Sequence, residues 1–193
     1  MYKFVLAFIL LATGSILTFG QEHETVLHAP DSWQSEIIPF PMDFTPGIPF
    51  TGFEDLRFSP GWADSTSQQF WTYCFAWYIE KQEAMTEIKL TEYFSAYYDG
   101  LMNVVAQAAD SAKSTTLNKA FCLFIKTNEG FSGKMRVHDS FFAKDTMTLN
   151  IKVSESFCSR TNKQIILCSI SPKDFDHPVW KIFDDVTLKV QCD

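Results

Sequence analysis

The sequence lacks every short motif that marks a particular enzymatic chemistry. It contains no G-x-S-x-G, no H-E-x-x-H, no G-x-x-x-x-G-K-[ST] and no G-x-G-x-x-G. This absence removes the better-marked hydrolases, zinc proteases and nucleotide-binding proteins. The chain also has no C-x-x-C pair, and its histidines are not spaced among its cysteines, so a structural zinc site has little support. We therefore expect neither a metal ion nor another cofactor.

Positive charge is also scarce. Lys and Arg total 16 against 23 for Asp and Glu, which gives a formal net charge of -7. Such a chain has no general electrostatic attraction to nucleic acid or to anionic lipid, so we expect neither as a partner. With 46% hydrophobic and 20% charged residues, the composition excludes a disordered chain, a collagen-like repeat and a polytopic membrane protein.

No apolar run is long enough to cross a bilayer, which takes about 20 residues. Residues 1–20 have one cation, Lys3, then an apolar run from Phe4 to Ala12, and small or polar residues after it. This pattern predicts a secretory signal peptide that is cleaved after Gly20. We expect a secreted or periplasmic protein with no stable membrane insertion after cleavage.

The five cysteines all follow this segment, so export would place them where disulfides persist. Cys158 and Cys168 flank a short polar turn, and a hairpin at this turn would bring the two residues roughly opposite each other. The sequence therefore predicts a disulfide between Cys158 and Cys168. The alternative is that both are buried free thiols, because Cys is among the most buried residue types.

Three zones follow the signal peptide. Residues 21–36 are polar without a clear period, and we expect a flexible arm there. Residues 37–62 combine five prolines with six aromatic residues, which predicts an extended strap over the core, with a possible short strand from Glu54 to Phe58. The strap begins a single domain that covers residues 37–193.

Hydrophobic periodicity predicts one helix and about six strands. Apolar residues at a spacing of three and four indicate an amphipathic helix over 91–112, and Gly100 inside it suggests a close approach to another segment. Alternation at every second position predicts strands near 70–79, 121–125, 134–138, 147–153, 164–170 and 186–192. One or two helical turns can follow Pro178. These elements predict an α+β fold, in which a curved antiparallel sheet of about six strands packs on one long amphipathic helix.

Two groups of residues are candidates for ligand binding. Polar and aromatic residues alternate at the end of the strap, where Asp55, Arg57 and Trp62 could hold a small ligand by stacking and charge-assisted hydrogen bonds. A pocket between helix and sheet would be lined by Trp77, Tyr97 and Tyr98. The alternative is that these aromatics fill the core and that Arg57 pairs with Asp55 to hold the strap.

Catalysis has only weak candidates, which are the adjacent pairs His138 with Asp139 and Asp176 with His177. Neighbouring residues on a strand point to opposite faces, so His138 and Asp139 are poorly placed to share a proton. A hydrolase that uses an Asp and a His is therefore an alternative to binding. A purely structural interaction module is a further alternative, and it predicts a filled core with an exposed apolar patch.

The segments FPMDFTPGIPFTGFEDLRFSPGW, FWTYCFAWYIE and FDHPVW together resemble a group of exported bacterial proteins with a Pro/Phe-rich N-terminal strap and no assigned activity. The resemblance implies export and a single domain, and it transfers no catalytic residue to this chain. The sequence as a whole favours non-catalytic binding, either of a small hydrophobic or aromatic ligand or of an envelope protein.

Overall fold

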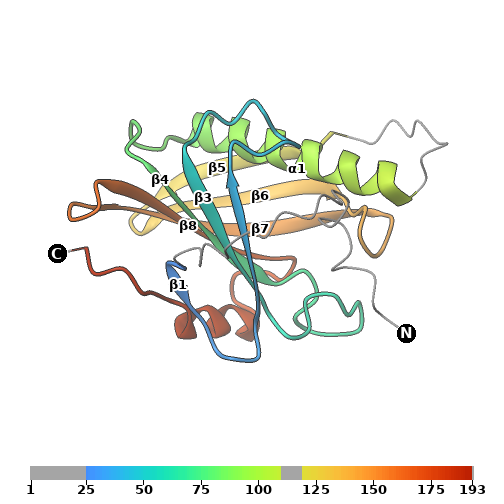
Figure 1. The fold of residues 1–193 in the computed structure, drawn as a ribbon. Helices are drawn as coiled ribbons and strands as arrows, with labels where there is room; N and C mark the ends of the chain where they lie inside the picture. Colours follow the sequence, from blue (N-terminus) through green and yellow to red (C-terminus); the bar gives the residue numbers. More distant parts are fainter. Residues whose placement is uncertain (1–24, 110–118, 193) are drawn as a thin grey trace, which may run out of the picture.

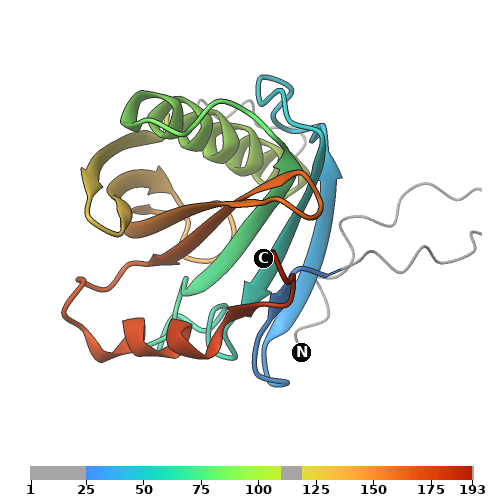
Figure 2. The same ribbon diagram turned by 90° about the vertical axis from the view of Figure 1, so that its left-hand side faces the viewer.

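The computed structural model describes residues 25–109 and 119–192, so the predicted signal peptide over 1–20 lies outside the described residues. The described chain folds as α+β, with one large antiparallel sheet curled around a long helix (Figures 1 and 2). The sheet has seven strands in the order β2-β3-β4-β8-β7-β6-β5. A separate two-stranded sheet of β1 and β9 packs against its outer face.

The helices are α1 (Glu87–Ala109) and the 3-10 helix η1 (Pro178–Asp185). The strands are β1 (Leu27–His28), β2 (Gln34–Phe40), β3 (Gly52–Phe58), β4 (Tyr73–Glu80), β5 (Phe121–Thr127), β6 (Gly130–His138), β7 (Thr146–Cys158), β8 (Lys163–Ser171) and β9 (Thr187–Leu188). The strands predicted near 121–125, 134–138, 147–153 and 164–170 are confirmed as β5 to β8, and each pairs with the next as an antiparallel meander.

The sheet has seven strands where about six were expected. The proline-rich segment adds β2 and β3, and β3 contains the possible short strand from Glu54 to Phe58, while the strand expected near 186–192 is not part of this sheet. β2 and β3 form an antiparallel pair, and β3 also pairs with β4. β2 lies at the edge of the sheet and can therefore hold Pro39, which has no N–H to donate. The expected flexible arm is also wrong for its described part, since Leu27 and His28 form β1 and Gln34 begins β2.

Helix α1 lies on the concave side of the sheet (Figure 2). It starts four residues earlier than the periodicity indicated, and the predicted end at residue 112 lies outside the described residues. Its buried residues include Phe94, Tyr97 and Tyr98, as the spacing predicted. A Cβ at Gly100 would lie 1.9 Å from the carbonyl oxygen of Phe44, which confirms the close approach that this glycine suggested.

Two apolar clusters lie on opposite faces of the sheet. The larger one fills the space between α1 and the concave face and is rich in aromatic residues, with Phe75 and Trp77 at its centre. The smaller one lies on the outer face, where Val26, Leu27 and Val186 cover parts of β4 and β8. Residues near the two ends of the described chain therefore close the second cluster together.

The predicted disulfide between Cys158 and Cys168 is wrong. Cys158 is bonded to Cys192, while Cys168 is a buried free thiol. The register explains the difference, because Cys158 lies opposite Lys163 and Cys168 lies opposite Val153, several residues further along the hairpin. The predicted C-terminal strand is likewise reduced to the short β9, and the disulfide fastens the tail that follows it.

Loss of this disulfide is expected to destabilise the protein. The bond closes a loop with a sequence separation of 34, for which the chain-entropy relation gives about 4 kcal/mol. Replacement of both Cys158 and Cys192 by Ser should therefore lower the free energy of unfolding by that order in a urea titration. Dithiothreitol should destabilise the wild-type protein but leave the double variant unchanged. Equal effects of the reductant on both proteins would contradict the assigned pairing.

Candidate functional site

The six residues expected to bind a ligand do not come together. Alternation along β3 and β4 places Asp55 and Arg57 on the outer face, whereas Trp77 points into the inner cluster with Tyr97 and Tyr98. Trp77 and Tyr98 are 0% exposed and Tyr97 is 3% exposed. Trp62 is buried against Phe58 and Phe142 at the margin of the inner cluster. No shared binding surface results from this arrangement.

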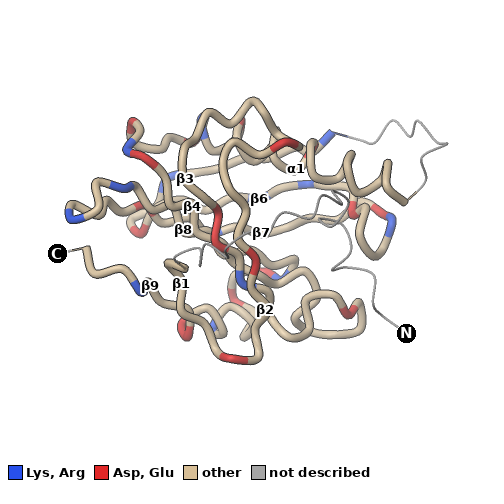
Figure 3. Tube along the Cα trace, viewed as in Figure 1, with Lys and Arg blue, Asp and Glu red and all other residues tan. Residues whose placement is uncertain are grey.

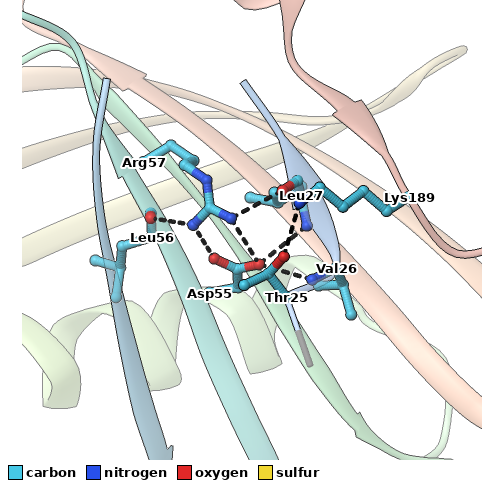
Figure 4. A network of polar contacts seen from close by, with 7 residues as sticks. All are labelled: Thr25, Val26, Leu27, Asp55, Leu56, Arg57 and Lys189. Carbon is cyan, nitrogen blue, oxygen red and sulfur yellow. Dashed lines mark hydrogen bonds and ion pairs between the residues drawn. The ribbon is translucent and has the colours of Figure 1, made fainter. Parts of the chain in front are cut away.

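Asp55 and Arg57 form a buried ion pair that holds the N-terminal strand β1 (Figure 4). The Asp55 carboxylate accepts the N–H groups of Val26 and Leu27 at 2.8 and 2.9 Å. The Arg57 guanidinium donates to the carbonyl of Leu27 at 2.8 Å. Arg57 therefore pairs with Asp55, as the alternative interpretation of these residues predicted, but the pair fastens β1 and not only the strap.

Glu54 is the ionisable group that the sequence analysis missed. Its carboxyl accepts hydrogen bonds from Trp77 Nε1 at 3.1 Å and from the Tyr97 hydroxyl at 3.0 Å, and it is 0% exposed. Burial raises its pKa from 4.5 to about 8. Figure 3 shows acidic positions along β3, the strand next to the edge strand β2. The available signal was two adjacent acids in one strand, since alternation must then send one carboxyl to each face.

The candidate catalytic pairs have other roles. The Asp139 carboxylate accepts the N–H groups of Phe141, Phe142 and Ala143 at 2.7 to 3.0 Å and so fixes the loop after β6. His177 Nδ1 accepts the N–H of Val179 at 3.1 Å and caps η1. Within the described residues, neither histidine forms a hydrogen bond or an ion pair with its neighbouring aspartate, and no three His, Cys, Asp or Glu side chains cluster as metal ligands.

An apolar row on the edge strand β5 is the clearest unexplained feature. Phe121, Leu123 and Ile125 are 60%, 59% and 66% exposed. The intervening residues Cys122 and Phe124 are buried beneath α1. Large apolar side chains in a contiguous exposed row are typical of a surface that binds another molecule.

The register extends this row into a wider surface on the side of the sheet opposite α1. Ile125, Leu123 and Phe121 lie opposite Ser132, Lys134 and Arg136 of β6, and Lys152 of β7 lies between Ser132 and Ser169 of β8. Directly opposed residues in antiparallel strands share a face. We call this surface the open face; its exposed and half-buried residues are Phe121, Leu123, Ile125, Ser132, Lys134, Arg136, Thr148, Lys152, Ser154, Leu167 and Ser169, while Asn150 on the same side is buried.

The open face is cationic although the chain is acidic. It carries Lys134, Arg136 and Lys152, and none of its residues is Asp or Glu. In the described part of the chain these three cations form no ion pair. Lys152 lies over the Trp180 ring, with Nζ 5.2 Å from its centroid, which positions this cation at the border of the open face.

A groove of about 480 Å³ lies on the open face. It runs from the β5–β6 turn over Ser132 and Lys152 to Leu167 and Ser169. Residues with hydroxyl groups therefore line a shallow depression beside the apolar row, together with Lys152, Leu167, and Asn128 and Glu129 of the turn at one end. This composition suits an extended, hydrogen-bonding partner better than a compact apolar ligand.

Comparisons of the chain with protein-family models, with curated proteins and with solved structures found no match. In the described residues, no helix combines the length and the apolar character that crossing a membrane requires.

The sequence analysis found the residues of the apolar row but not their exposure. Alternation along 121–125 gives two apolar sets, Phe121, Leu123 and Ile125 on one face and Cys122 and Phe124 on the other. Which set meets the helix depends on the side from which α1 packs. A strand that is apolar on both faces was the available signal, because a helix packed on one side of an antiparallel sheet covers only one of these faces.

Proposed function

We propose that this protein is a non-catalytic binding protein in an oxidising compartment outside the cytoplasm, and that it binds a partner protein through the open face. The observation that carries the proposal is the exposed row of Phe121, Leu123 and Ile125 beside three cations that lack an ion-pair partner in the described residues. Protein interfaces combine such apolar anchors with Arg and a polar rim.

The location outside the cytoplasm is supported by the bond between Cys158 and Cys192, because structural disulfides persist in oxidising compartments. The predicted signal peptide over 1–20 agrees with this location. An envelope or secreted protein is accordingly the partner that we propose.

A small aromatic ligand between helix and sheet is less well supported. Trp77, Tyr97 and Tyr98 pack against one another and against Phe75 and Phe94, with ring centroids 5.1 to 6.4 Å apart. Entry of a ligand there would require this packed cluster to open. The groove on the open face therefore supports binding better than the interior does.

Site-specific crosslinking in the native host tests the proposal. A photoreactive amino acid at Thr148, which is exposed on the open face, should give one dominant adduct with another exported protein after irradiation. The same amino acid at Glu92, on the exposed side of α1, is the matched control and should give none. Adducts are identified by mass spectrometry.

Two results would contradict the proposal. The first is the absence of a dominant adduct at Thr148, or equal adducts from Thr148 and Glu92. The second is a small molecule that stays with the purified protein in native mass spectrometry and is lost when the core residue Trp77 is replaced by Leu. That second result would restore the small-ligand hypothesis.

A further inference from the structure

The two edges of the large sheet are protected to very different degrees. At one edge, β2 contains Pro39 and the half-buried acid Glu36, both of which oppose pairing with another strand. At the other edge, β5 pairs with β6 over its whole length without a bulge, and it contains no proline and one charged residue, Lys126. Such an edge is a template for a further strand, because β5 is the last strand of the sheet in the described residues and its outward N–H and C=O groups face away from β6.

We propose that β5 receives an extended acidic segment of the partner protein as an eighth strand, an inference that rests on the proposed function of the open face. Backbone hydrogen bonds to the free edge of β5 would supply the affinity, and alternate side chains would supply the selectivity. One set of side chains would lie beside Phe121, Leu123 and Ile125, and the other set beside Cys122 and Phe124 at the border of α1.

Charge complementarity identifies the chemistry of this segment. An added strand lies about 5 Å from β5 and therefore about 10 Å from β6. A Glu side chain on the added strand can place its methylene groups over the apolar row and meet the long side chains of Lys134 and Arg136. The opposite side of the segment continues the apolar cluster. The fitting sequence thus alternates acidic and β-branched residues.

A second copy of this chain fits the edge less well. Two copies that pair through β5 would bring the like charges of Lys134 and Arg136 of both β6 strands toward each other. An anionic lipid surface satisfies the cations but leaves the backbone groups of β5 unpaired.

Binding of a model peptide tests strand addition directly. The probe is an acetylated and amidated eight-residue peptide that alternates Glu and Val, and the matched peptide alternates Lys and Val. We expect the Glu peptide to bind the full protein at least tenfold more tightly than the Lys peptide in titration calorimetry. Amide hydrogen exchange should slow in β5 at the positions that point away from β6, and not in β2.

The charge contribution is tested with a pair of variants of equal net charge. Lys134→Glu with Arg136→Glu should weaken binding of the Glu peptide at least tenfold. The control, Arg160→Glu with Lys181→Glu, changes exposed cations outside the open face and should leave the affinity within a factor of two. Equal losses in the two variants would overturn the assignment of the cations.

The remaining outcomes separate this inference from the proposed function. Strand addition is refuted if the peptide binds without slowing amide exchange in β5. It is also refuted if β5 is protected in the free protein and the peptide does not bind. In either case a crosslink at Thr148 would still support the proposed binding function. A concentration-dependent dimer that Leu123→Lys abolishes assigns the edge to a second copy. Tighter binding to vesicles of phosphatidylglycerol than to the Glu peptide assigns it to lipid. Each of these results refutes the acidic segment as the occupant.

Discussion

Replacement of Glu54 by Gln is expected to remove a steep pH dependence of stability. Between pH 5 and pH 8, the wild-type protein should lose about 4 kcal/mol of unfolding free energy relative to the variant, at about 1.4 kcal/mol per pH unit. The measurement is a series of urea titrations across this range. Gln keeps an oxygen acceptor for Trp77 or Tyr97 and adds no ionisable group.

The sign follows from the two pKa values of Glu54. Unfolded chains lose this proton near pH 4.5, whereas the folded protein holds it up to about pH 8 because the buried carboxylate would be poorly solvated. Unfolding therefore releases a proton throughout this window, so a rising pH favours the unfolded state. Below pH 4.5 the neutral carboxyl contributes its full share to the free energy of unfolding, and above pH 8 this share is fully lost.

Glu36 provides the matched control for this experiment. Partial burial raises its pKa as well, but its side chain lies on the edge strand β2. Glu36→Gln should therefore change the pH dependence less than Glu54→Gln does. Identical slopes for the wild-type protein and Glu54→Gln would show that this carboxyl is ionised in the folded state, contrary to the expected titration.

Replacement of Arg57 by Ala is expected to cost about 3–5 kcal/mol of stability. The substitution leaves Asp55 as an unpaired charge with 0% exposure, and the carbonyl of Leu27 loses its side-chain donor. Release of β1 would then uncover the outer cluster around Val26. The midpoint of thermal or urea unfolding measures the loss.

A double variant separates the charge from the side-chain packing. Asp55→Asn with Arg57→Met removes both charges and keeps most of the volume, so it should be more stable than Arg57→Ala alone. Affinity of the open face for the Glu peptide should stay the same in both variants. Unchanged stability of Arg57→Ala together with lost peptide binding would assign Arg57 to a binding site instead.

The sequence predicted the parts of the fold in which one period holds over many residues. Helix α1 and the meander of β5 to β8 follow from alternation and from the spacing of residues such as Phe94 and Tyr98. Proline density hid the hairpin of β2 and β3, because Pro39 is compatible with a strand only at an edge. Whether a strand lies at an edge depends on the whole sheet, so it cannot be predicted from the local sequence.

The candidate site was predicted less well for a related reason. Asp55 and Arg57 were singled out as unusual residues, yet their role depends on Val26 and Leu27, which lie far away in the sequence. The disulfide failed similarly, since Cys192 reaches Cys158 only after the tail has folded back. Contacts between distant segments determine which aromatic side chains are buried and which, such as Phe121, are exposed on the open face.

The pairing of β1 with β9 has a consequence for the order of assembly. Leu27 lies opposite Leu188, so the first described strand, β1, can pair only after β9, near the end of the chain, has been made. On the proposed export route, a chain that crosses a membrane N-terminus first cannot complete the outer layer until its C-terminal segment has crossed. In a partly exported chain this layer would stay unfolded, so the remaining chain could still cross the membrane. Formation of the disulfide between Cys158 and Cys192 would then stabilise the completed fold.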